Sequence, residues 1–176
     1  TTGAYQLPKI AEKLAEARLT RLNISIDGPE DIHNHIRGQE DSFQNSIEGL
    51  QMFHQRAKSI GYSPEIYLNY TISNLNHHAL VDFYDSVKDL PINQCNFTYM
   101  WFISPDIAEA HNKEYGDIYP ITSSCYNEHT NPHKVEIKVM FEQIQSLKGK
   151  PKVAFLPEFS EEKLERFFHN PNSFME

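Results

Sequence analysis

Two segments of the chain carry polar side chains along one face, where a polar ligand could bind. Polar residues alternate with apolar ones in residues 21–27 and again in residues 65–73, the pattern of β-strands with one polar face. The polar rows include Asn23, Ser25, Asp27, Asn69 and Thr71. Hydroxyl, amide and carboxyl groups together offer both hydrogen-bond donors and acceptors. We therefore expect these rows to face a wet cavity that receives a polar ligand.

The segments between the predicted strands show helical periodicity. Apolar residues recur every three or four positions in four internal segments, and Ser160 can cap a final short helix. The predicted helices cover residues 7–19, 42–60, 77–87 and 132–148, with Asp41 and Asn76 as N-caps, and the predicted strands cover residues 21–27, 65–73, 96–104 and 152–156. Residues 105–131 are expected to form an irregular excursion, or a short helix and a loop.

Strands that alternate with helices predict right-handed crossovers and a parallel sheet. In an open sheet covered on both faces, each unpaired polar group would cost about 1–3 kcal/mol. A curved half-barrel avoids this cost, and Ser25 and Asp27 would lie at the carboxyl end of their strand, where barrels place their chemistry. We therefore predict an α/β fold, an incomplete TIM-like (β/α) barrel. A one-sided antiparallel sheet or an ordinary open sheet remains the alternative.

The length fits a single domain, with residues 1–104 forming a βαβαβ portion and residues 105–176 a loop, helix, short strand and helix. The net charge of −8 argues against nucleic acid or an anionic membrane as a partner. No apolar run is long enough for a membrane span, and no targeting peptide is visible. Cys95 and Cys125 form no CxxC unit, so we expect reduced thiols and a cytoplasmic location.

Other chemistries find less support in the sequence. Cys125, His129 and His133 have a spacing that could bind zinc on a helix, but a Thr-Asn-Pro stretch interrupts that helix and favours a solvated loop. Cys95 precedes an apolar strand and is expected to be a small buried hydrophobe rather than a nucleophile. His33 and His35 lie beside a turn and are interpreted as surface histidines.

The stretch ISIDGPEDIHNHIRG, together with the preceding Thr1-Thr2-Gly3 and helix, resembles the middle of radical S-adenosylmethionine enzymes. The Asp-Gly-Pro with Ile32, His33 and Arg37 is most similar to the branch of anaerobic sulfatase maturases and peptide-modifying enzymes. The stretch PEFSEEKLERFFHNP resembles the region before a SPASM-type auxiliary cluster domain.

This resemblance implies roles for six residues. It implies that Ser25 hydrogen-bonds S-adenosylmethionine and that Arg37 approaches its methionine carboxylate. It also implies that Asp27 helps to hold the same wall of the cofactor site. A guanidinium can grip a carboxylate through two parallel hydrogen bonds. Met100 matches an apolar residue along the adenosine, and Asn69 and Thr71 would face the same cavity.

The family's C-x3-C-x2-C, which holds a [4Fe–4S] cluster, is absent from the sequence. We therefore expect a middle fragment of an oxidoreductase that cleaves S-adenosylmethionine to a 5'-deoxyadenosyl radical, acting on a substrate that could be a peptide or protein. In isolation it is expected to be inactive, to bind neither cofactor, to bind no metal and to self-associate through open sheet edges. The alternative is a non-catalytic α/β domain that binds a nucleoside-like ligand.

Overall fold

Four parallel strands form the centre of the protein, whose computed structural model describes residues 4–122 and 131–170. They are β1 (Arg21–Ser25), β2 (Glu65–Ile72), β3 (Gln94–Tyr99) and β4 (Val153–Leu156), hydrogen-bonded in chain order. All three pairings are parallel. The predicted α/β fold with a parallel sheet is therefore confirmed, and the antiparallel alternative is wrong.

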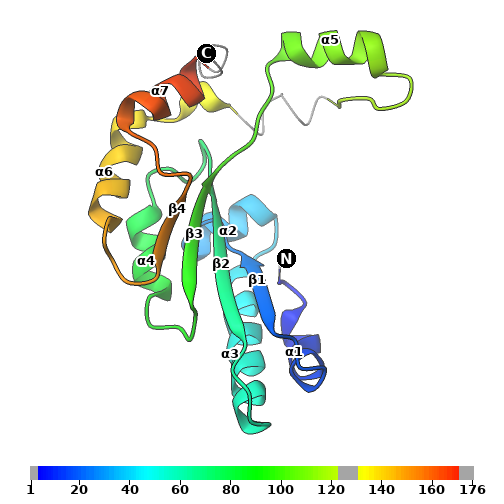
Figure 1. Cartoon of the computed structure of the whole chain (residues 1–176), viewed down its shortest axis with the longest axis vertical. Coiled ribbons are helices and arrows are strands. Elements are labelled where there is room, and N and C mark those ends of the chain that lie inside the picture. The colour runs from blue at the N-terminus through cyan, green and yellow to red at the C-terminus, as the bar shows by residue number, and fades with distance from the viewer. Residues whose placement is uncertain (1–3, 123–130, 171–176) are drawn as a thin grey trace.

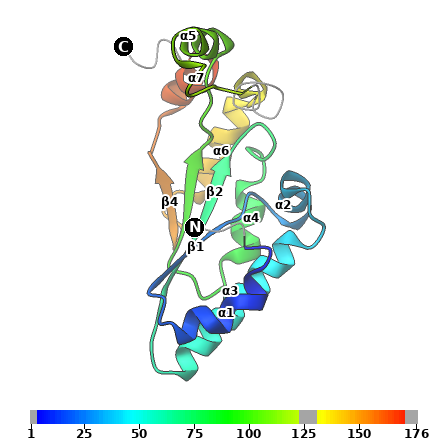
Figure 2. The same ribbon diagram turned by 90° about the vertical axis from the view of Figure 1, so that its right-hand side faces the viewer.

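The helices lie mainly on one side of this sheet, as Figures 1 and 2 show for α1, α2, α3, α4 and α6. The helices are α1 (Leu7–Glu16), α2 (Glu30–Arg37), α3 (Ser42–Ser59), α4 (Leu80–Val87), α5 (Pro105–Tyr115), α6 (Ile137–Leu147) and α7 (Glu161–His169), with a 3₁₀ turn at Pro132–Lys134. Within the described residues, no helix is laid across the opposite face. This arrangement agrees with a partial TIM-like barrel, although the sheet is not closed.

The apolar rows of the strands make the core beneath the helices. Ile24 of β1, Leu68 and Tyr70 of β2, and Phe97 of β3 have no exposed surface. The Tyr70 ring lies 4.9 Å from Phe83 of α4, between centroids. Burial of such large side chains stabilises the sheet against its helices by about 1.5–3 kcal/mol for each residue. The alternation in the sequence thus separates a dry face from a polar one.

Several predicted boundaries differ from the structure. Residues 30–37, for which no helix is predicted beside the Asp-Gly-Pro turn, form α2, because Glu30 and Asp31 favour a helix start and Gly38 ends it with φ +64°. Asn76 does not cap α4, which begins at Leu80, and its side chain bonds to strand ends instead. Residues 100–104 continue β3 in the prediction but contain no strand in the structure.

Gly49 sets how closely α1 and α3 approach each other. A methyl group on Gly49 would lie 2.6 Å from Leu7 Cγ and 2.8 Å from the Pro8 backbone nitrogen. We predict that Gly49→Ala lowers the free energy of unfolding by about 1–3 kcal/mol, measured by urea denaturation, because the helices must separate. An increase in stability, which the higher helix propensity of alanine alone would give, would contradict this packing.

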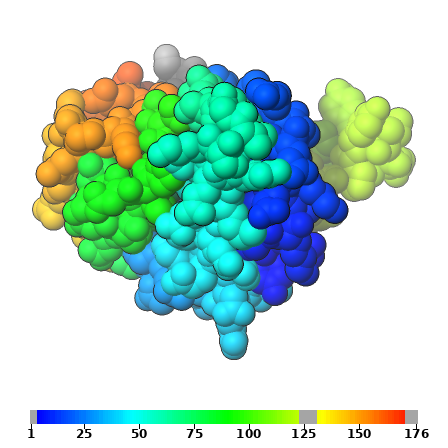
Figure 3. All heavy atoms as spheres, turned by 90° about the horizontal axis from the view of Figure 1, so that it is seen from below, coloured from blue at the N-terminus to red at the C-terminus, as the bar shows by residue number. Residues whose placement is uncertain are grey.

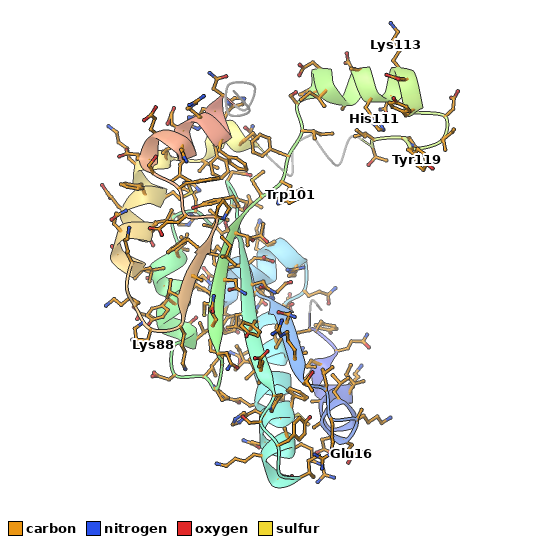
Figure 4. All side chains as sticks on the ribbon, viewed as in Figure 1. Glu16, Lys88, Trp101, His111, Lys113 and Tyr119 are labelled. Atoms are coloured by element: carbon orange, nitrogen blue, oxygen red, sulfur yellow. The ribbon has the colours of Figure 1, made fainter. Side chains whose placement is uncertain are left out.

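Helix α5 stands away from the body of the molecule. It follows the carboxyl end of β3, and Figures 1 and 3 show it projecting beyond the sheet. Trp101, on the segment that leads to it, is 92% exposed, and Figure 4 shows its place at the base of this segment. The predicted excursion at residues 105–131 therefore begins with a helix on an extended connection, and residues 123–130 of it lie outside the described part of the chain.

Candidate functional site

The face of the sheet that the helices leave uncovered, called the open face below, carries a band of polar side chains, the polar band. Ser25 of β1, Asn69 of β2 and Asn96 of β3 lie side by side in register. Asn96 Nδ2 donates to Asn69 Oδ1 at 3.0 Å, and Gln94 Nε2 donates to Asn96 Oδ1 at 2.9 Å. These side chains are half-buried, so the band is open to a ligand while its amides orient one another.

An ion pair lies at the carboxyl end of β1, beside this band. Arg37 Nη2 is 2.5 Å from Asp27 Oδ2. Asp27 is 6% exposed, whereas the Arg37 side chain is 33% exposed. Burial raises the pKa of the Asp27 carboxyl, and this outweighs the lowering by Arg37 and by the Thr71 backbone N–H. Arg37 thus places its positive charge against a buried carboxyl group, while about a third of its side-chain surface stays exposed to solvent.

Asn76 fastens the ends of β1 and β2 together from a fully buried position. Its Nδ2 donates to the carbonyl of Asp27 at 2.8 Å and to that of Thr71 at 2.9 Å. Its Oδ1 accepts from the Ser73 backbone N–H at 2.7 Å, and its own carbonyl accepts from the Tyr70 hydroxyl. Both hydrogens of the amide are donated to carbonyls at the strand ends. The Asn76 side chain therefore fixes the position of the Asp27 backbone.

His33 is buried, so its interpretation as a surface histidine is wrong. Its Nδ1 accepts the Asp27 backbone N–H at 3.0 Å, and its Nε2 lies 3.0 Å from Ser42 Oγ. Burial, with a smaller contribution from Arg37, lowers the pKa of His33 to about 4. The imidazole is therefore neutral at physiological pH.

Gly28 allows the turn between β1 and α2 to close tightly. A Cβ at this position would lie 2.7 Å from Ile32 Cγ2. The absence of a side chain lets the first turn of α2 fold back on the strand end, and it is from this turn that His33 reaches Asp27.

The structure brings together most of the residues predicted for the site. Ser25, Asn69 and Thr71 lie on or at the end of the open face, while Asp27 and Arg37 pair beside them. Met100 is 3% exposed and belongs to the main core, so its contact with an adenosine stays a prediction.

Sequence reasoning missed three residues around the site: His33, Asn76 and Asn96. The alternation of Gln94, Asn96 and Thr98 in the third strand was the available signal for Asn96. His33 and Asn76 lie beyond the ends of the strands, where no alternation of this kind marks a residue for the site.

The part of the chain that the structure describes contains no metal-binding cluster and no reactive thiol. No group of three or more histidine, cysteine, aspartate or glutamate side chains is placed to hold a metal ion there. Cys125 and His129 of the predicted zinc alternative lie outside the described residues. Cys95 is buried, as expected, and burial raises the pKa of its thiol to about 12.

We predict that this thiol is inert in the folded protein. In a Cys125→Ser variant at about pH 8, Cys95 should react with iodoacetamide at least about a hundredfold more slowly than in urea, because the thiolate is the reactive form. Equal rates in the folded and unfolded protein, followed by mass spectrometry, would contradict the buried position.

No protein-family model matches the chain. Its sequence is similar to that of two kinds of enzyme, GTP 3',8-cyclases and an AdoMet-dependent heme synthase. It is 32% identical over 93 residues to a GTP 3',8-cyclase of Vibrio parahaemolyticus, and 36% identical over 101 residues to one of Listeria welshimeri. It is 29% identical over 91 residues to an AdoMet-dependent heme synthase of Methanosarcina barkeri, whose name refers to S-adenosylmethionine. These similarities support the radical S-adenosylmethionine resemblance. They do not support the sulfatase maturase branch in particular.

The matched regions cover 52%, 57% and 51% of this chain, respectively. They cover only 26%, 29% and 24% of the relatives, so the chain spans about a quarter of their length. Among the described residues, no helix has the length and apolar character needed to cross a membrane.

The described residues fit one of the two cofactors that the resemblance implies. The polar band and the partly exposed Arg37 offer hydroxyl, amide and guanidinium groups that suit the amino-acid and nucleoside parts of S-adenosylmethionine. They do not fit an iron–sulfur cluster, because Cys95 is the one cysteine among them and is buried away from the open face.

Proposed function

We propose that this chain forms part of the wall of a radical S-adenosylmethionine enzyme, with the open polar face of the sheet as its cofactor-binding surface. The observation that carries the proposal is the register of Ser25, Asn69 and Asn96 beside the Asp27–Arg37 pair. A parallel sheet normally buries both faces, so a polar open face at the strand ends indicates a ligand. The similarity to enzymes named GTP 3',8-cyclase and AdoMet-dependent heme synthase supports the class.

In this function the chain's own residues bind and orient the cofactor. Ser25 and Asn69 contact its polar groups, and Arg37, whose side chain is partly exposed, binds its carboxylate with guanidinium nitrogens other than the Nη2 that pairs with Asp27. When bound with a reduced cluster, S-adenosylmethionine supplies a carbon radical that abstracts hydrogen from a substrate. Since the described residues do not hold the cluster, we propose that its cysteines come from elsewhere in the whole protein, and that this chain alone is inactive.

The finer parts of the proposal rest on the sequence resemblance. The Asp-Gly-Pro stretch with Arg37 is the basis for proposing the sulfatase maturase branch and, with it, a peptide or protein substrate. The names of the relatives refer to GTP and heme, so the comparisons do not support that substrate. A cytoplasmic location and self-association through the β1 and β4 edges stay predictions.

A non-catalytic nucleoside-binding domain is the second candidate, because the amide band alone could hold a nucleoside. One experiment separates the two. The whole protein is reconstituted anaerobically with iron and sulfide, mixed with S-adenosylmethionine and dithionite, and assayed for 5'-deoxyadenosine. Formation of this product, with loss in Arg37→Ala and retention in the exposed-site control Arg21→Ala, is expected. A protein that carries a cluster, binds adenosine and forms no product would support the second candidate.

A further inference from the structure

The buried imidazole of His33 accepts a hydrogen bond from the backbone of Asp27, the carboxylate residue of the ion pair, and the proposed function gives it no role. His33 lies on α2, four residues before Arg37. Its ring is enclosed, with Phe43 edge-on at 6.2 Å between centroids. A buried polar ring with both nitrogens bonded is a fixed connection rather than a solvated side chain.

The hydrogen bonds determine which tautomer is present. The Asp27 backbone N–H donates to His33 Nδ1, so this nitrogen carries no proton. In the neutral ring the proton therefore lies on Nε2, which donates to Ser42 Oγ at 3.0 Å. Ser42 is the first residue of α3, and its carbonyl accepts from the Ser46 hydroxyl at 2.7 Å. The ring thus connects the end of β1 to the start of a long helix in the core.

The backbone of Asp27 needs such a connection because the strand has already ended. The last backbone hydrogen bond from this segment to β2 is from the Ile26 N–H to the Asn69 carbonyl at 3.0 Å. Beyond it, His33 holds the Asp27 N–H and Asn76 holds the Asp27 carbonyl. With both backbone groups fixed, the carboxylate is directed at Arg37.

We propose that His33 is a positioning residue that acts on the cofactor site through Asp27 and Arg37. His33 fixes the Asp27 backbone and thereby the direction of its carboxylate, the carboxylate holds the Arg37 guanidinium, and the guanidinium contacts the ligand. This inference rests on the proposed function for the last of these steps only. The first two steps are properties of the chain without any ligand.

Two conservative variants separate the two ring nitrogens. His33→Asn places an amide oxygen near the position of Nδ1 and can still accept the Asp27 N–H, whereas His33→Gln places its amide near Nε2 and cannot. His35→Gln, on the exposed side of the same helix, is the matched control. In the ligand-free chain, hydrogen exchange of the Asp27 amide followed by NMR should become about tenfold faster in His33→Gln, and within about threefold of wild type in His33→Asn and His35→Gln. Unchanged protection in His33→Gln would overturn the proposal.

A binding cycle tests whether His33 acts through Arg37. In the reconstituted whole protein, His33→Gln should weaken S-adenosylmethionine binding about tenfold, and His33→Asn should restore it to within about threefold. In an Arg37→Ala background His33→Gln should have no further effect. An equal loss in both backgrounds would mean a merely structural role and would overturn the proposal. If Arg37→Ala itself leaves affinity unchanged, the proposed function fails, while the amide exchange still decides whether His33 positions Asp27.

Discussion

Asn76→Asp should destabilise the protein by about 3–5 kcal/mol. The wild-type amide uses both hydrogens on the carbonyls of Asp27 and Thr71, at 2.8 and 2.9 Å. A carboxylate would put a charge against two acceptors in a position with no exposed surface. Because a domain of this size has only about 5–15 kcal/mol of stability, the variant should be close to unfolded under mild conditions. Urea denaturation followed by circular dichroism measures the loss.

Asn74→Asp is the matched control for this prediction. Asn74 is half-buried, and its Oδ1 accepts the Asn131 backbone N–H at 3.1 Å, a role that a carboxylate oxygen can keep. Its cost should stay below about 1 kcal/mol. Similar losses in the two variants would mean that the strand ends are not held together by the Asn76 amide.

Arg37→Ala should produce the second large effect, a loss of about 2 kcal/mol near pH 7, because it leaves the Asp27 carboxylate buried without its cation. The partial exposure of Arg37 keeps this loss below that of a fully buried pair. Asp27→Asn in the same protein should recover much of the stability, since a neutral amide needs no counter-ion. If the double variant is as unstable as Arg37→Ala, packing of the arginine side chain and not its charge is responsible.

The loss caused by Arg37→Ala should also depend on pH. Burial already raises the pKa of Asp27 in the folded protein, and removal of Arg37 takes away an opposing influence, so that pKa rises further. When the pKa of a carboxyl is higher in the folded than in the unfolded protein, the free energy of unfolding falls as pH rises from the unfolded value to the folded one. The difference in unfolding free energy between wild type and Arg37→Ala should therefore shrink from about pH 7 to about pH 4. A difference that stays constant would contradict the assignment to Asp27.

The fold was predictable from the sequence where local periodicity and tertiary packing agree. The alternation around Ile24 and Leu68 gave the strands and their buried face, and Ser25 and Asn69 lie on the polar face as expected. Helix α2 was missed because Asp-Gly-Pro is also strong turn chemistry, and local signals do not show whether a turn continues into a helix.

The supports of the site were not predictable in the same way. Asn76 has good N-cap chemistry, but its amide bonds to the ends of two strands, and Asp27 at one of them is distant in sequence. His33 is polar and follows a turn, and its burial depends on how α2 packs against the start of α3. Asp41 occupies an N-cap position, yet the Phe43 N–H is bonded by Asn34 from the preceding helix. In each case a partner from another strand, turn or helix replaces the one within the same turn that sequence reasoning assumes.

One binding comparison tests the central claim, that the open face binds S-adenosylmethionine with Arg37 on its carboxylate. The whole protein, reconstituted anaerobically, is titrated with S-adenosylmethionine and with its decarboxylated analogue. The same titrations are made on Arg37→Gln combined with Asp27→Asn, which keeps the pair neutral. The wild type should prefer S-adenosylmethionine by at least about tenfold, the value of a charge-assisted hydrogen bond, and the double variant should bind both ligands alike. The same preference in both proteins would contradict the role of Arg37, and no binding of either ligand to the wild type would contradict the assignment of the face.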